Sequence, residues 1–200
     1  MHLDYRQLLD LLFPRSDDEI VIAKITPDAI LDHMSITTTA HATALSSYKD
    51  PVIRAAVHLV KYHQHQHATT LLRSLIEHYL QNRPGDICIV PVPLSAARLR
   101  QRGYNQVSVV AKQTSLPVHE TVLLRHRHTR PQTALTRAER NKNVQQAFTL
   151  TTAESALHEA VGKDLILLDD VLTTGATLKA AAAALRPLPY RSLTCVALAH

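Results

Sequence analysis

Two adjacent acids followed by a hydroxyl-rich bend are the stretch of this sequence whose residue types and spacing best suit chemistry. Residues 165–177 read LILLDDVLTTGAT, in which Asp169 and Asp170 precede a bend around one glycine. Threonine hydroxyls and backbone N–H groups at a helix amino terminus favour an anion, because orphan donors and the helix dipole point towards it. The segment predicts a phosphate-binding bend made of Thr173, Thr174, Gly175, Ala176 and Thr177.

A buried strand and a helix would position these residues. The continuous apolar run 165–168 is typical of a parallel strand buried on both faces. The acids then fall at its carboxyl end, where open α/β sheets bind ligands. The run 178–185 predicts the helix, and Gly175 indicates either a positive φ or a close approach of a ligand. The alternative is a buried strand that ends in solvated acids and a threonine cap.

The whole segment 165–177 resembles the phosphoribosyl-pyrophosphate (PRPP) signature of type I phosphoribosyltransferases. The resemblance implies an α/β fold of that type, with a mostly parallel twisted sheet flanked by helices and a small N-terminal elaboration. It also implies that the residues from Thr173 to Thr177 hold the 5-phosphate and that Asp169 and Asp170 meet the ribose hydroxyls. Mg²⁺ would be held mainly through PRPP, with no direct protein ligand.

An arginine-rich segment follows a second predicted strand. Residues 87–92 (ICIVPV) predict a buried strand with prolines at its end. In a phosphoribosyltransferase the loop after this strand holds the pyrophosphate. Arg98 and Arg102 match that task, because a guanidinium pairs with two phosphate oxygens at once. A solvated basic face is the alternative, which we favour for Arg100.

Apolar spacing predicts the other elements. Asp50 and Pro51 mark the start of a helix. Helical spacing continues to residue 76, either as two helices with a hinge or as one long helix. The shorter elements that we expect are helices at 3–13, 27–33, 107–112 and 153–160, and strands at 20–25, 37–45, 118–124 and 193–198.

Residues 125–143 lack apolar periodicity and carry many basic side chains. A loop of this length within a compact domain is usually functional or disordered. Its charge predicts a lid that closes over an anionic substrate and excludes water.

Three ordered segments resemble the ComF family, the type I phosphoribosyltransferase-like proteins linked to bacterial competence for DNA uptake. They are PVPLSAARLRQRGYNQ, RHRHTRPQTALTRAERNKNVQQAF and ILLDDVLTTGAT. The resemblance covers about residues 48–198, including Tyr48, Lys61 and Tyr62, and its recurrent lid positions include Arg127, Gln132 and Arg140. Two departures stand out: the family's N-terminal four-cysteine zinc module is absent, and the glycine that usually follows the Lys-Tyr pair is replaced by a His/Gln run.

The resemblance implies Mg²⁺-dependent transfer of ribosyl-5-phosphate from PRPP, or another phosphorylated ribose, to an unknown acceptor. Asp169, Asp170 and Arg140 would be catalytic, and Arg98 and Arg102 would bind pyrophosphate. One alternative is a non-catalytic competence protein that binds DNA or protein partners on the same fold. Another alternative is a nucleotide-binding regulator, which the sequence does not distinguish from the non-catalytic competence protein.

Composition limits the class of protein. Two hundred residues suit one globular domain, which we divide into an N-terminal elaboration (1–47) and a phosphoribosyltransferase-like domain (48–200). The net charge of +5 fits either a pyrophosphate-bearing small molecule or nucleic acid. Two Phe and no Trp weaken the case for stacking single strands. No apolar run or signal peptide stands out, so we expect a cytoplasmic location without membrane insertion. The oligomeric state stays open.

Cysteines and histidines give weaker indications. Cys88 and Cys195 lie in apolar runs and are expected to be reduced core residues, and no zinc is expected. His63 and His67 have the four-residue spacing of metal ligands on one helical face. A polar surface turn explains the HQHQH run equally well.

Overall fold

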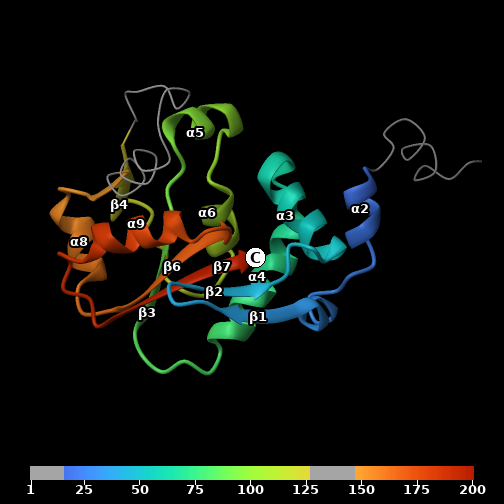
Figure 1. Ribbon diagram of the computed structural model, residues 1–200, viewed down its shortest axis with the longest axis horizontal. Helices are drawn as coiled ribbons and strands as arrows, with labels where there is room; N and C mark the ends of the chain where they lie inside the picture. The colour runs from blue at the N-terminus through green and yellow to red at the C-terminus, as the bar shows by residue number, and fades with distance from the viewer. Residues whose placement is uncertain (1–15, 127–146) are drawn as a thin grey trace, which may run out of the picture.

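A five-stranded sheet forms the centre of the protein, for which a computed structural model describes residues 16–126 and 147–200 (Figure 1). Strands β2, β7, β6 and β3 run parallel to one another, and β1 pairs with β2 in the antiparallel direction. This arrangement confirms the predicted α/β fold with a mostly parallel sheet. In spatial order the strands are β1 (Met34–Thr38), β2 (Thr43–Ser46), β7 (Ser192–Ala199), β6 (Asp164–Val171) and β3 (Ile87–Pro91).

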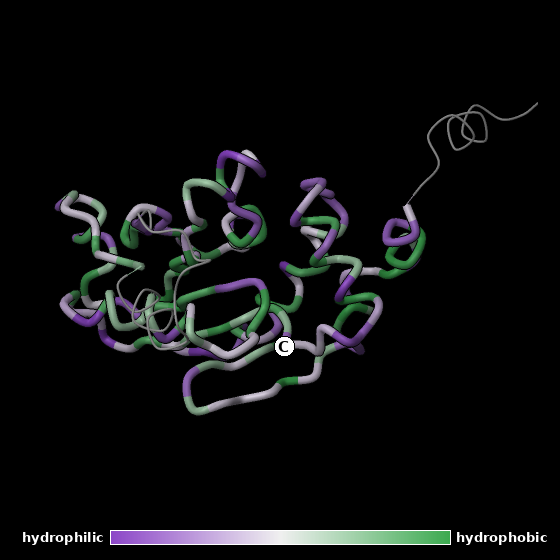
Figure 2. The backbone as a smooth tube through the Cα atoms, turned by 45° about the horizontal axis from the view of Figure 1, so that its top comes forward, coloured by the Kyte–Doolittle hydropathy of each residue, from purple (hydrophilic) through white to green (hydrophobic). Residues whose placement is uncertain are grey.

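Helices cover both faces of the sheet, which explains why its inner strands are continuously apolar. In β6, Ile166 and Leu168 pack into a core with the helices of one face, whereas Leu165 and Leu167 pack into the core of the other. The first face carries α3 (Pro51–His63), α4 (Gln66–Leu80) and α6 (Gln106–Ala111), and the second carries α8 (Glu154–Ala160) and α9 (Ala176–Leu185). Figure 2 shows hydrophilic and hydrophobic residues interspersed along the backbone.

The register of the strands brings distant segments to one edge of the sheet. β3 and β6 pair from Ile87 opposite Asp164 to Pro91 opposite Leu168, so their carboxyl ends lie together. The Val92 N–H then donates to the Leu168 carbonyl at 2.8 Å. The segments that follow β3 and β6, which carry the predicted arginines and acids, therefore start side by side.

The strand predicted at residues 20–25 is wrong. Residues Asp17–Ile22 form helix α2 instead, followed by the short 3₁₀ helix η1 (Ala29–His33). A capping box starts α2: the Ser16 hydroxyl accepts from the Glu19 N–H at 3.3 Å, and the Ser16 N–H donates to the Glu19 carboxylate at 2.7 Å. These bonds satisfy orphan donors of the helix, which outweighs the β preference of its isoleucines and valine.

The strand predicted at 118–124 differs in place and partner. Val118 makes only an isolated bridge to Ile89. A separate antiparallel hairpin pairs β4 (Leu123–Arg125) with β5 (Phe148–Leu150). The helix predicted at 3–13 lies outside the described residues, and the domain boundary at residue 48 stays a prediction. Among the helices of the described ranges, none is both long and apolar enough to cross a membrane.

A sharp turn separates α3 from α4, which confirms the hinged alternative. Gln64 ends α3 with φ 49, in the left-handed region, and α4 begins at Gln66. The prediction that His63 and His67 share a helical face is therefore wrong. His67 Nε2 lies 3.2 Å from the Ile22 carbonyl oxygen. Within residues 16–126 and 147–200, no group of three or more His, Cys, Asp or Glu side chains is arranged to hold a metal ion.

We expect Gln64→Gly to stabilise the protein. Glycine adopts positive φ without the steric cost that a side chain imposes, and Gln64 is exposed at this turn. Urea unfolding should show a gain of about 0.5–1 kcal/mol in the free energy of unfolding. Gln81 is the matched control, since it ends α4 with φ −53. A gain for Gln81→Gly as large as that for Gln64→Gly would contradict the explanation.

Candidate functional site

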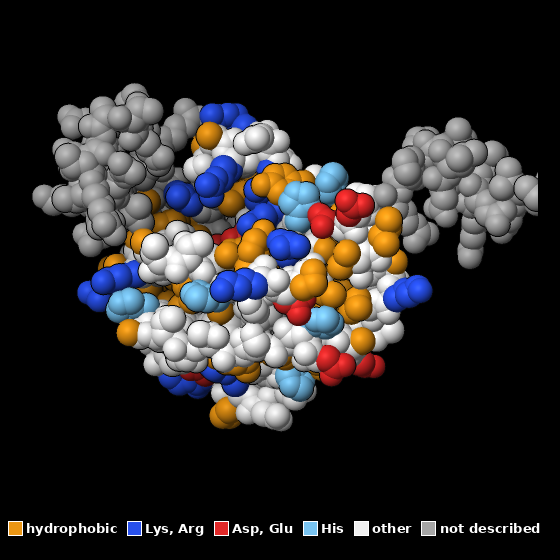
Figure 3. Space-filling view, turned by 45° about the vertical axis from the view of Figure 1, so that its right-hand side comes forward, with side chains coloured by type: hydrophobic (Ala, Val, Ile, Leu, Met, Phe, Trp, Pro, Cys, Tyr) orange, Lys and Arg blue, Asp and Glu red, His pale blue; other side chains and the backbone are white. Residues whose placement is uncertain are grey.

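A cavity of about 750 Å³ opens at the carboxyl edge of the sheet. It collects side chains from segments far apart in the chain, and Figure 3 shows Lys and Arg side chains gathered around a hollow on one face. Four cations and two carboxylates are among its lining groups. The lining residues are Tyr48, Lys61, Tyr62, Val92, Pro93, Leu94, Arg98, Gln101, Arg102, Gln106, Arg125, Asp169, Asp170, Val171, Thr173 and Thr177.

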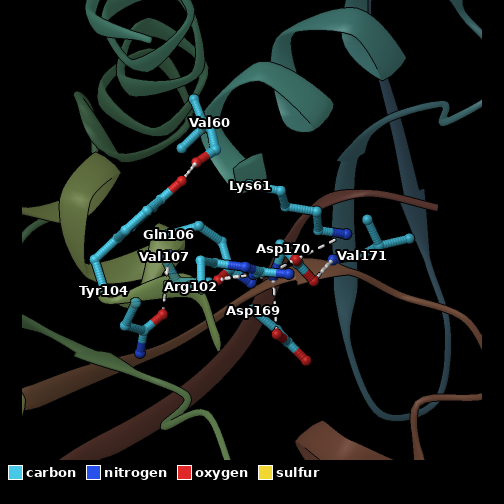
Figure 4. Close-up of polar contacts among 10 residues, drawn as sticks. Val60, Lys61, Arg102, Tyr104, Gln106, Val107, Asp169, Asp170 and Val171 are labelled. Carbon is cyan, nitrogen blue, oxygen red and sulfur yellow. Dashed lines mark hydrogen bonds and ion pairs between the residues drawn. The ribbon is translucent and has the colours of Figure 1, made fainter. Parts of the chain in front are cut away.

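The Asp170 carboxylate joins three elements that surround the cavity. Lys61 Nζ, from the end of α3, lies 2.9 Å from its Oδ2 atom. Gln106 Nε2, from the start of α6, donates to the same oxygen at 2.7 Å. The N–H of Val171 donates to Oδ1 at 2.6 Å. Figure 4 shows these groups converging on Asp170, which fixes the distance between α3, α6 and the end of β6.

A second layer of contacts supports this arrangement. Arg102, at the end of α5 (Ala96–Arg102), donates to the Gln106 side-chain oxygen and lies with its guanidinium carbon 5.3 Å from the Tyr62 ring centre. The Tyr104 hydroxyl donates to the Val60 carbonyl at 2.7 Å (Figure 4). The segment between α5 and α6 is thereby held against the carboxyl end of α3.

Asp169 lies in a different environment from its neighbour. Its Oδ1 atom accepts from the Asp170 N–H at 2.9 Å, and no described residue donates to Oδ2. Burial, and next the nearby Asp170 charge, raises the pKa of Asp169 to about 7, against the opposing influence of Lys61 and Arg125. Asp169 therefore changes charge near neutral pH and keeps one oxygen available to a ligand.

The bend after the acids leaves several backbone donors available. Gly175 has φ 74 and precedes α9, so the first of the two explanations for this glycine holds. Ala176 N–H is 3.4 Å from the Thr174 hydroxyl, and Lys179 N–H donates to the Gly175 carbonyl at 2.9 Å. The N–H groups of Thr173, Thr174, Gly175 and Thr177 have no acceptor in the described part of the chain. They meet the condition for an anion site at a helix amino terminus.

The structure brings together most of the predicted site residues. The cavity lining includes Asp169, Asp170, Thr173, Thr177, Arg98 and Arg102, while Thr174, Gly175 and Ala176 form the adjoining bend. Arg100 is exposed and is not part of the lining. The predicted lid residues Arg127, Gln132 and Arg140 lie outside the described residues.

Sequence reasoning did not assign Lys61, Gln106 or Arg125 to the site. Lys61 and Gln106 lie in the part of the sequence that resembles the ComF family, and this resemblance was the available indication. Nothing in local spacing places Lys61 beside Asp170, because the two are more than 100 residues apart in the chain.

The donor set suits a magnesium ion that is held mainly by a ligand. Mg²⁺ usually takes one or two protein carboxylates and completes its shell with waters and substrate phosphates. Asp169 keeps an oxygen available, whereas three donors already engage Asp170.

Comparison with known proteins adds independent information. Residues 61–200 match the model of the phosphoribosyl transferase domain family. The chain is 34% identical over 116 residues to "Competence protein F" of Haemophilus influenzae, covering 56% of this chain and 49% of that protein. It is 30% identical over 94 residues to "Competence protein ComFC" of Bacillus subtilis, covering 47% and 36%. The matches span about half of the first relative and about a third of the second.

The solved structures include a similar fold in the "allosteric regulatory enzyme of purine biosynthesis". The TM-score is 0.42 with 16% sequence identity, and the match covers 71% of this chain and 30% of that one.

We expect Asp169→Asn to remove a pH-dependent cost of folding. The variant keeps an oxygen for the Asp170 N–H but cannot ionise. Because the pKa of Asp169 is about 7 in the folded protein and about 4 in an unfolded chain, ionisation destabilises the native state as pH rises between these values. Urea unfolding at about pH 5 and pH 8 should show the advantage of the variant growing by about 1–3 kcal/mol.

Asp164→Asn serves as the control, because ionisation of Asp164 stabilises the folded state, whereas ionisation of Asp169 destabilises it. Hydrogen bonding from Arg191, more than from Ser192, lowers the pKa of Asp164 to about 2, so its charge stabilises the folded state. That stabilisation is complete above the unfolded pKa of about 4 and is lost as pH falls towards the folded value. Parallel pH curves for the wild type and Asp169→Asn would contradict the environment described for Asp169.

Proposed function

The chain belongs to the phosphoribosyl transferase domain family and is similar to the ComF competence proteins, and on this premise we propose that it binds PRPP with Mg²⁺ and transfers the ribosyl-5-phosphate group. One observation carries the proposal. Two carboxylates at the end of β6 and a bend whose amides have no acceptor among the described residues lie at one cavity that four cations line. A ribose that carries a phosphate at one end and a diphosphate at the other would suit this cavity. Its phosphate would accept from the amides of the bend, its diphosphate from the cations, and its hydroxyls would donate to the carboxylates.

Each group has a role in this proposal. The bend from Thr173 to Thr177, including Thr174, Gly175 and Ala176, binds the 5-phosphate, for which the backbone donors and the dipole of α9 are suited. The carboxylates of Asp169 and Asp170 accept hydrogen bonds from the ribose hydroxyls. Arg98 and Arg102, which line the cavity from α5, bind the pyrophosphate.

The reaction breaks the bond between ribose C1 and the pyrophosphate oxygen, and the pyrophosphate leaves with the electron pair. A nucleophilic atom of the acceptor forms the new bond to C1 and loses its proton. The two carboxylates stabilise the positive charge that develops on the ribose, and the arginines stabilise the leaving group. Arg140, the predicted catalytic residue of the lid, belongs to the same proposal. Mg²⁺ would supply further charge neutralisation on the diphosphate.

We expect Asp170→Asn to weaken the binding of PRPP at least about tenfold, since the variant loses the charge that Lys61 and the ribose hydroxyls require. Calorimetric titration with PRPP and Mg²⁺ measures the affinity, and a pyrophosphate-release screen over candidate acceptors tests turnover. Asp86→Asn is the control, because Asp86 precedes β3 at the opposite end of the sheet and pairs with Lys163 at 2.8 Å. Unchanged affinity in Asp170→Asn would overturn the placement of the ribose.

The similarity to two competence proteins favours a second candidate. In it, the chain is a competence protein that binds DNA on the same fold. The cations that line the cavity, Lys61, Arg98, Arg102 and Arg125, would contact phosphates of a single strand. Such a complex depends on salt because binding releases counterions.

For four phosphate contacts on a single strand, affinity should fall about 50-fold between about 50 and 200 mM salt. Fluorescence anisotropy with a labelled oligonucleotide measures this, and excess PRPP should displace the strand if both occupy the cavity. No association at low salt would exclude direct DNA binding.

A further inference from the structure

Arg125 is a cation of the cavity whose hydrogen-bonding capacity is almost unused by the described residues. It ends strand β4 and lies across the hairpin from Phe148, with its guanidinium carbon 5.1 Å from the Phe148 ring centre. Its Nη1 atom donates to the Pro93 carbonyl at a long 3.4 Å. Its Nε atom is buried and has no partner in the described part of the chain. A guanidinium has five N–H donors, so four of them have no acceptor among residues 16–126 and 147–200.

The charge of Arg125 is also uncompensated. No carboxylate among residues 16–126 and 147–200 lies within ion-pair distance of it, although it lines the cavity beside Asp169. Burial, more than the neighbouring Arg98, lowers the pKa of Arg125, and Asp169 acts in the opposite direction. Arg125 is half-buried, and a cation that is shielded from water without a partner is costly.

Two other arginines that lie over aromatic rings are better satisfied. Arg102 donates to Gln106 and stacks on Tyr62. Arg83, at the other end of the sheet, also stacks on an aromatic ring, but donates to the Tyr79 hydroxyl at 2.6 Å and to the Thr194 hydroxyl at 3.2 Å. The lack of partners at Arg125 is therefore a property of its place in the cavity and does not follow from stacking.

We propose that Arg125 and Arg98 form a two-arginine clamp for the diphosphate of the ligand, with Arg125 as the half-buried, prearranged arm. This inference rests on the proposed function. It adds Arg125 to the pyrophosphate site, for which Arg98 and Arg102 were proposed. Arg98 is exposed on α5 and Arg125 is fixed by Phe148, so the clamp has one adjustable arm and one rigid arm.

The clamp selects the charge of the ligand. Two guanidinium groups held near each other repel, and an anion between them removes the repulsion while it fills their donors. A diphosphate has enough charge and oxygen atoms to engage both arms, whereas a sugar hydroxyl or a neutral base does not. The cavity is accordingly built for ribose phosphates that carry a second, multiply charged group.

Calorimetry with three probes tests the clamp: PRPP with Mg²⁺, pyrophosphate with Mg²⁺, and ribose 5-phosphate. Arg125→Gln should weaken PRPP and pyrophosphate about tenfold or more and leave ribose 5-phosphate within about twofold. Arg125→Lys, which keeps the charge but loses the planar fork, should give an intermediate loss. Arg83→Gln removes a stacked arginine outside the cavity, and Arg100→Gln removes an exposed one on α5; both should bind as the wild type does.

The outcomes separate the clamp from the wider proposal. Wild-type affinity for PRPP in a folded Arg125→Gln variant, or an equal loss for ribose 5-phosphate, overturns the clamp. If Arg125→Gln fails to fold, Arg125→Lys and Arg98→Gln decide by the same criterion. A wild-type protein that binds pyrophosphate through Arg125 but not PRPP contradicts the proposed function and leaves the clamp standing. A protein that binds neither contradicts both.

Discussion

The carboxylate of Asp170 holds the walls of the cavity in place. It pairs with Lys61 on α3 and accepts hydrogen bonds from the Gln106 side chain on α6 and from the Val171 N–H at the end of β6. These elements come from distant parts of the chain, and their shared core and the Tyr104–Val60 hydrogen bond also hold them together. Since both members of the Lys61–Asp170 pair are largely shielded from water, removing either would leave a poorly solvated charge on the other. The shape of the cavity therefore depends in part on the Asp170 carboxylate.

The cavity concentrates charge that the described residues do not fully neutralise. Lys61 is paired with Asp170, but Arg98 and Arg125 have no carboxylate partner within the described ranges. The pKa of Asp169 is raised by burial and that of Arg125 is lowered by it, so the fold holds both groups in surroundings that disfavour their charged forms. Such unfavourable placement is typical of binding sites, where a ligand supplies the missing partners. Here it favours an anion with hydroxyl groups beside it.

Local sequence rules predicted the centre of the site but not its walls. The strand, bend and helix from 165 to 185 follow from a continuous apolar run and one glycine, because each depends on neighbours in the chain. The contact of Lys61 with Asp170 depends on how α3 packs on the sheet, which no spacing encodes. The β-type prediction for 20–25 failed since a capping box outweighed side-chain propensity, and the hairpin that fixes Arg125 joins segments 23 residues apart.

The two adjacent acids differ in what they offer to a ligand, although their side chains are identical. Every oxygen of Asp170 already accepts hydrogen bonds, so a ribose hydroxyl reaches it only by sharing or displacing Lys61 or Gln106. Asp169 has an oxygen that no described residue contacts. A ligand would therefore engage Asp169 first. Only its contact with Asp170 would change the contacts that Lys61 and Gln106 make with that carboxylate. Binding at the second acid is thereby coupled to α3 and α6, whose ends carry Lys61 and Gln106.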